Sequence, residues 1–221
     1  MLGDLILICA LVPIVIALLT LLSVRLMSAR PELLPAPELA EALRAAVSPV
    51  MRQVLQRNGF EFAEAYKFHN VELGVWLKRD ANVPVRRFSF LRTNDTSTFE
   101  LITEFSDNTS LTTSKSRSAF FLPRPYGGFV QSFPSKGLEE LLSLHGEGER
   151  YLVEQRGVEI IPFRLTFLER FRTGAARQFA LIRSTPLWPI RGIYWFLLKR
   201  FLLQNKPIWE QDLDRLYPKV S

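Results

Sequence analysis

The sequence predicts an α+β fold with an N-terminal transmembrane helix, an amphipathic helix, a small antiparallel β-meander of about 4–5 strands and a basic helical C-terminal region. Three patterns predict this fold: an uncharged apolar run, a middle section with period-two alternation, and a final third in which arginines alternate with aromatic residues. We expect four parts: an anchor and its flank at 1–30, a linker at 31–37, an α+β domain at 38–160 and a basic aromatic helical tail at 161–221.

The N-terminal run from Leu5 to Val24 contains 20 uncharged residues, which as a helix would span about 30 Å, the thickness of a membrane core. A cleaved signal peptide is the alternative, and it is disfavoured because no Lys or Arg precedes the run. Arg25, Arg30 and Arg44 follow the run, so the positive-inside rule predicts a single-pass inner-membrane protein, N-terminus outside and most of the chain cytoplasmic.

The next segment combines a proline-rich linker with an amphipathic helix. Residues 31–37 hold three prolines, which indicates a stiff connection. The helix places one apolar stripe toward a core, formed by Leu39, Leu43, Ala46, Val47, Val50 and Val54. Ser48 and Pro49 interrupt this stripe, and they predict a kink or two short helices, because proline removes a backbone donor.

From residue 60 to about 133, apolar and polar residues alternate as they do in half-buried strands. Clusters of Asn, Asp and Thr separate the alternating segments at a spacing typical of an antiparallel meander. The segment from Ser110 to Ser118 is polar on both faces, so it is expected to be an edge strand or a loop. A further helix is expected from about Leu138 to Gly157, interrupted in its pattern by Gly146 and Gly148.

The tail is strongly basic. Between 161 and 206, nine Lys and Arg residues and one Glu give a net charge of +8, whereas the whole chain carries +6. Its aromatic residues lie among Leu and Ile, which favours contact with an anionic membrane surface over nucleic acid. The predicted membrane-surface residues are Trp188, Arg191, Tyr194, Trp195, Lys199 and Arg200. A helix across 187–203 either lies on the bilayer or packs into the domain core.

Familiar catalytic patterns are absent from the sequence: there is no GxSxG, HExxH, GxGxxG or Walker-type phosphate loop. The single cysteine, Cys9, excludes an intrachain disulfide and a cysteine-based zinc site. His145 begins an HxE fragment typical of zinc deaminases, but the PCxxC motif that must accompany it is missing. We therefore predict no catalytic residue, no metal ligand and no cofactor.

The loop around Pro123 and Pro125 is the most distinctive connection, and Arg124, Tyr126 and Phe129 are the candidate partner-binding residues. The preferred hypothesis is a single-pass, membrane-anchored, non-enzymatic interaction or scaffold protein, an accessory subunit of a larger membrane assembly. Its expected partners are anionic lipids and a protein, with no nucleic acid. The alternative is a membrane-bound hydrolase or transferase with an unfamiliar site that uses His69, His145 or acidic strand residues on a lipid or membrane-associated substrate.

Overall fold

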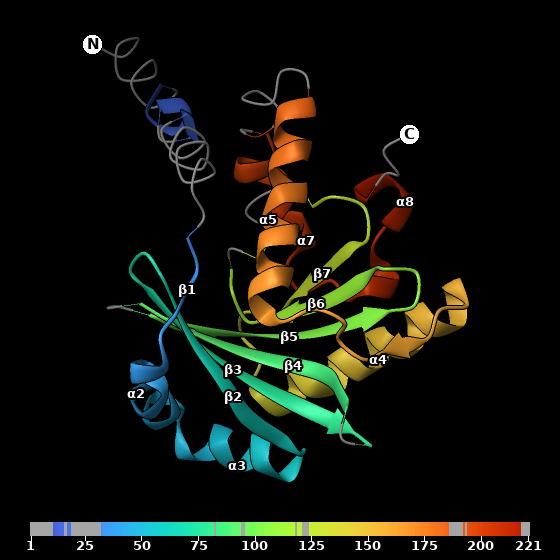
Figure 1. Ribbon diagram of the computed structural model, residues 1–221. Helices are drawn as coiled ribbons and strands as arrows, with labels where there is room; N and C mark the ends of the chain where they lie inside the picture. Colours follow the sequence, from blue (N-terminus) through green and yellow to red (C-terminus); the bar gives the residue numbers. More distant parts are fainter. Residues whose placement is uncertain are drawn as a thin grey trace.

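The computed structural model describes residues 11–15, 17–18, 32–81, 83–93, 96–117, 119–120, 124–185, 192 and 194–217. The described chain is an α+β structure, built on one mostly antiparallel sheet with helices on both faces (Figure 1). The predicted α+β class is therefore confirmed, but the sheet has eight strands, more than the predicted 4–5.

The sheet follows the chain in the order β1-β2-β3-β4-β5-β6-β7, and β8 pairs with β5. Neighbouring strands run antiparallel except β6 and β7, which are parallel. The strands are β1 (Leu34–Pro35), β2 (Phe60–Phe68), β3 (Val71–Asp80), β4 (Val83–Arg92), β5 (Ser97–Phe105), β6 (Ser110–Ser114), β7 (Gly128–Ser132) and β8 (Ile160–Ile161).

The predicted number of strands was too low because some strands show little or no alternation of apolar and polar residues in the sequence. Strands β1 and β8 have two residues each, too few to display an alternation. Strand β6 lies inside the sheet, between β5 and β7, although its sequence is polar on both faces. Its polar side chains are satisfied there: Thr113 bonds to His145, and Ser114 donates to Glu100 at 3.1 Å.

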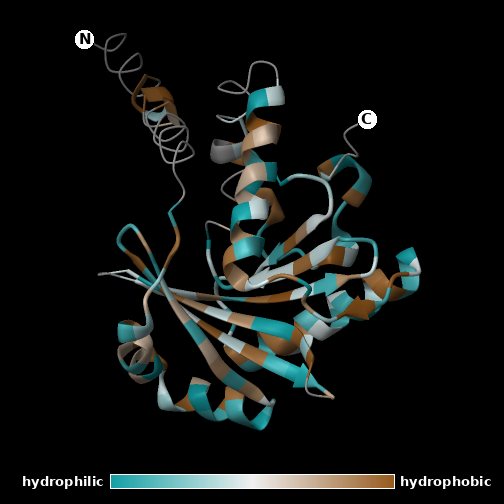
Figure 2. Ribbon diagram, viewed as in Figure 1, coloured by the Kyte–Doolittle hydropathy of each residue, from teal (hydrophilic) through white to brown (hydrophobic). Residues whose placement is uncertain are grey.

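The helical elements are η1 (Pro37–Leu39), α2 (Ala40–Ala46), α3 (Pro49–Arg57), α4 (Leu138–Arg156), α5 (Phe167–Ser184), the π-helical η2 (Trp195–Lys199), α7 (Arg200–Leu203), η3 (Ile208–Glu210) and α8 (Leu213–Leu216). Helices α2, α3 and α4 cover one face of the sheet, and α5 rises from the other (Figure 1). The α3 and α4 ribbons carry both hydrophilic and hydrophobic residues (Figure 2), as helices with one buried side do.

The predicted break at Ser48 and Pro49 is confirmed. Helix α2 ends at Ala46, and Val47 takes an extended conformation with ψ of 123°. Ser48 then caps α3 by accepting a hydrogen bond from the backbone N–H of Met51 at 3.3 Å, and Pro49 occupies the first helical position. The two helices are therefore separate pieces.

The prediction of a single-pass protein of the cell membrane is contradicted. Among the residues that the structure describes, no helix has the length and apolar character needed to cross a membrane. Most of the predicted span, Leu5–Val24, lies outside the described residues. The residues described within it, 11–15 and 17–18, are helical.

Candidate partner-binding groove

A buried polar network lies between α4 and the sheet. His145 and Glu149 stand one helical turn apart, and their side chains are 1% and 2% exposed. The imidazole Nε2 lies 2.9 Å from the hydroxyl of Thr103, and Nδ1 lies 2.7 Å from the hydroxyl of Thr113. Arg86 completes the network through an ion pair with Glu149.

The order of donors and acceptors in this network follows from its fixed ends. Thr103 donates to the Glu149 carboxylate, so its oxygen must accept from the Nε2–H of His145. The side-chain amide of Gln131 donates to the Thr113 hydroxyl at 2.7 Å, and the same hydroxyl bonds to Nδ1 of His145.

This network includes His145, one of the residues that the hydrolase or transferase hypothesis would use. Both ring nitrogens of His145 are occupied, and the ring is sealed beneath α4. A cavity of about 550 Å³ borders Arg86 and Glu149, but His145 is not among the residues that line it. The other histidine, His69, is an exposed turn residue with φ of 52°, with its ring 4.6 Å from that of Phe68.

The pKa of Glu149 reflects these contacts. Burial alone would raise it, but the hydrogen bonds and charges of His145 and Arg86 outweigh burial and lower the pKa to about 2. The carboxylate is therefore ionised at neutral pH. Its charge is held inside the structure by Arg86 on β4, which ties α4 to the sheet.

The three predicted partner-binding residues lie near one another but differ in exposure. Arg124 donates to the backbone oxygen of Ala119 at 3.2 Å, and the Tyr126 hydroxyl accepts from Arg156 at 2.9 Å. Both side chains are half-buried. Phe129 is 1% exposed and its ring packs against Tyr217, so it belongs to the core and presents no surface to a partner.

The predicted membrane-surface residues fall into two groups. Trp188 and Arg191 lie outside the described residues. Tyr194 is 56% exposed, whereas Lys199 and Arg200 are half-buried. The indole N–H of Trp195 donates to the backbone oxygen of Phe120 at 2.7 Å, so this side chain fixes η2 against the domain.

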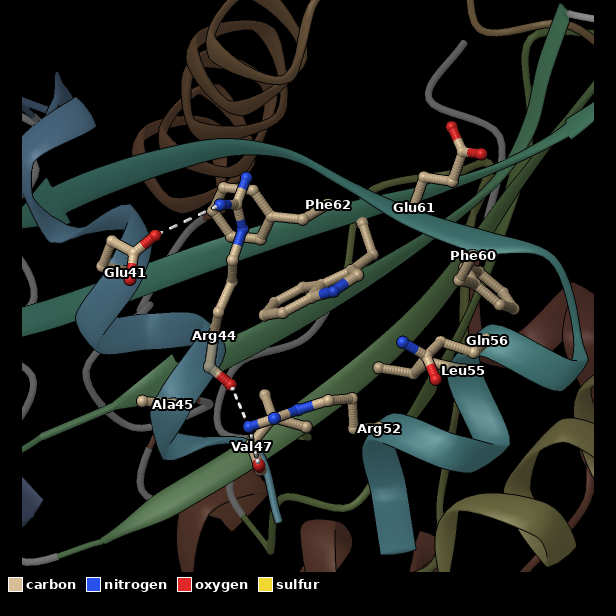
Figure 3. A pocket seen from close by; sticks show the side chains of 11 residues that line it. Glu41, Arg44, Ala45, Val47, Arg52, Leu55, Gln56, Phe60, Glu61 and Phe62 are labelled. Atoms are coloured by element: carbon tan, nitrogen blue, oxygen red, sulfur yellow. Dashed lines mark hydrogen bonds and ion pairs between the residues drawn. The ribbon is translucent and has the colours of Figure 1, made fainter. Parts of the chain in front are cut away.

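A groove of about 500 Å³ lies beneath α2 and α3 (Figure 3). Buried apolar side chains form its floor: Val47, Leu55, Phe60 and Trp76. Exposed polar side chains form its rim: Glu41, Arg44, Arg52, Gln56 and Glu61. An apolar floor with a few polar groups at the edge is the usual composition of a binding pocket.

Two irregularities of the backbone open this groove. The break at Ser48 separates α2 from α3, and both helices contribute to the walls. On the other side, the register of β2 against β3 shifts between Phe62 and Glu64, which is a β-bulge. A bulge increases the local twist of a strand and redirects side chains. The Phe62 and Trp76 rings meet edge to face beside it, with centroids 4.9 Å apart.

The arginines on the rim are held in place. The guanidinium of Arg44 lies 4.4 Å from the centroid of the Phe62 ring and 3.8 Å from Glu41 (Figure 3). Arg52 donates to the backbone oxygens of Arg44 and Val47, at 2.9 and 3.3 Å, which satisfies two carbonyls left unpaired at the end of α2. The rim therefore carries both positive and negative groups.

Sequence reasoning did not predict this groove, since its residues are spread over four elements and Phe60, Phe62 and Trp76 appear in the sequence as ordinary strand residues. The only local signal is the helix break at Pro49. Within the described residues no group of three or more His, Cys, Asp or Glu side chains is placed to hold a metal ion. In comparisons with family models, curated proteins and solved structures, nothing matches this chain.

Proposed function

We propose that this protein is a non-enzymatic interaction module that binds a protein partner through the groove beneath α2 and α3. The observation that carries the proposal is the apolar floor of the groove, formed by Leu55, Phe60 and Trp76, with charged residues along its rim. The occupant that fits is an apolar or aromatic side chain of the partner.

The physical case rests on how interfaces gain their free energy. Full burial of one large apolar side chain contributes about 1.5–3 kcal/mol. Pockets lined by Trp and Arg are frequent centres of binding free energy, because those side chains bury much area in rigid positions. Arg44 and Glu41 lie beside the floor, where they can bond to the backbone of a bound segment.

The alternative function, a hydrolase or transferase, has no observation in its favour among the described residues. Asp107, in the turn after β5, accepts hydrogen bonds from Thr109, and Glu104 pairs with Arg170. His69 lies in a turn and His145 lies in α4, where its side chain is buried. His145 and Thr103 do lie within hydrogen-bond distance, but both are buried and neither lines the cavity beside Glu149.

The proposal predicts that filling the groove abolishes binding. Peptides selected from a random phage-displayed library on the full-length chain should carry an apolar or aromatic anchor residue. Ala45→Trp places an indole at the wall of the groove, so we expect it to weaken binding of these peptides at least about tenfold in a calorimetric titration.

Val50→Trp is the matched control, because Val50 lies in α3 outside the groove and is 73% exposed. This variant should bind the selected peptides with an affinity within about twofold of the unchanged protein. If peptides are selected but Ala45→Trp binds them as well as Val50→Trp does, the groove is not the binding surface.

A further inference from the structure

We propose a second site, a phosphate-binding pocket between α5 and the turn that joins β5 to β6. A cavity of about 220 Å³ lies there, and three arginines line it: Arg164, Arg170 and Arg177. Its volume is below the roughly 300–1,000 Å³ of pockets for drug-sized ligands, so it fits a small anion. This site is separate from the groove and does not depend on the proposed function.

The helix places two of the arginines in register. Arg170, Thr173 and Arg177 occupy positions i, i+3 and i+7 of α5, which lie on one side of a helix. Arg164 reaches the same cavity from the segment between β8 and α5. The sequence thus supplies a guanidinium from each of three positions around one hollow.

The carboxylates near the cavity do not neutralise it. Glu104 pairs with the Nε of Arg170 at 3.1 Å, and its side chain is 8% exposed. The charge of Glu104 is also felt by the buried Arg87 beneath it. Asp107, on the adjoining turn, is engaged by the backbone N–H and hydroxyl of Thr109.

Arg164 and Arg177 have no ion pair with any carboxylate of the described residues, and both are exposed. One buried Glu against three arginines leaves a net charge of +2 at the cavity. Guanidinium groups bind phosphate oxygens through paired, charge-assisted hydrogen bonds. The Thr173 hydroxyl and the Asn108 amide line the same space and add neutral donors.

Inorganic phosphate tests this site directly. The full-length protein is titrated with phosphate at constant ionic strength, with binding followed by calorimetry. We expect saturable binding that Arg164→Gln with Arg177→Gln weakens at least about tenfold. Sulfate should compete with phosphate, whereas chloride at equal ionic strength should not, since it lacks the oxygens that guanidinium groups pair with.

A pair of arginines on α5 provides the control. Arg172→Gln with Arg183→Gln removes the same charge from exposed positions of α5 that do not line the cavity. This variant should keep phosphate affinity within about twofold. Equal losses in the two double variants would show diffuse attraction to a basic helix and would overturn the proposal, as would the absence of saturable phosphate binding. Equal melting temperatures establish that both variants fold.

Discussion

Glu149 carries a buried negative charge, and its contribution to the stability of the fold depends on pH. The pKa in the folded state is about 2, against an ordinary value of 4.5. A group with a depressed folded pKa stabilises the fold above its unfolded pKa, and this contribution is lost as the pH falls toward the folded pKa. The relevant window is therefore pH 4.5 down to about 2.

Glu149→Gln should show this dependence. At pH 7 the variant should have a free energy of unfolding lower by about 3 kcal/mol, because Arg86 and Thr103 lose their charged partner. The difference between the two proteins should shrink between pH 5 and pH 2, measured by urea unfolding at each pH. A difference that stays constant across this range would contradict the charged network.

Arg87 presents the opposite problem, a buried positive charge on the other face of the sheet. It is 2% exposed, and its guanidinium lies 4.2 Å from the ring centroid of Phe163 and 5.1 Å from that of Phe167. Within the described residues its Nε and Nη1 have no hydrogen-bond partner. Burial lowers the pKa of Arg87 to about 10, and the charges of Glu104 and Glu64 oppose that shift.

Replacing Glu104 alone should lower the free energy of unfolding more than replacing Glu104 and Arg87 together. Glu104→Gln should lower the free energy of unfolding by about 3 kcal/mol, since it leaves Arg87 buried without its largest opposing charge. Glu104→Gln combined with Arg87→Met should recover at least about half of that loss. Denaturant unfolding of the single and double variants gives the comparison. A double variant less stable than Glu104→Gln would show that the cation itself stabilises the fold through its ring contacts.

Helix α4 illustrates what an element requires beyond helix propensity. Its pattern contains two glycines, each of which weakens a helix by about 1 kcal/mol relative to alanine. A Cβ at Gly148 would meet the Leu111 Cδ2 at 2.9 Å and the Gln131 Nε2 at 3.2 Å. A Cβ at Gly146 would meet nothing within 4 Å. Gly148 therefore allows α4 to approach the sheet, and Gly146 has no such role.

The two glycines should respond oppositely to alanine. Gly146→Ala should raise the free energy of unfolding by about 0.5–1 kcal/mol, the gain in helix propensity. Gly148→Ala should lower it by about 1–3 kcal/mol, because Leu111 and Gln131 must move in a packed interior. Thermal unfolding of both variants measures the contrast. Equal stabilisation by the two substitutions would contradict the close packing of α4 on β6 and β7.

Some helices and strands could be predicted from the sequence because local patterns determine them. The break at Pro49 and the meander from β2 to β5 follow from rules that act within a few residues: proline geometry, period-two alternation and turn residues. The parallel pairing of β6 with β7 depends on residues far apart in sequence. The Tyr217 hydroxyl and the Gln211 side chain bond to Val130 on the outer edge of β7, and no local pattern reports such contacts.

At the scale of the whole molecule, the groove forms only where several separate elements of the chain come together. The groove collects Arg44 from α2, Leu55 from α3, Phe60 from β2 and Trp76 from β3, and its shape depends on a bulge that alternation does not reveal. The basic character of the tail was visible in the sequence. The sequence did not show which of these basic residues line a cavity. Arg177 lines it and Arg183 does not, and this difference depends on how α5 lies on the sheet.

The central claim is that the groove beneath α2 and α3 receives an apolar side chain of a partner. The most direct measurement is the indole N–H region of a ¹⁵N-labelled spectrum during titration with a selected peptide. Trp76 lines the groove, whereas Trp209 packs near Tyr151 in a different core cluster. The account predicts that the Trp76 signal shifts in proportion to saturation while the Trp209 signal stays in place. An unchanged Trp76 signal at saturation, with shifts elsewhere, would contradict it.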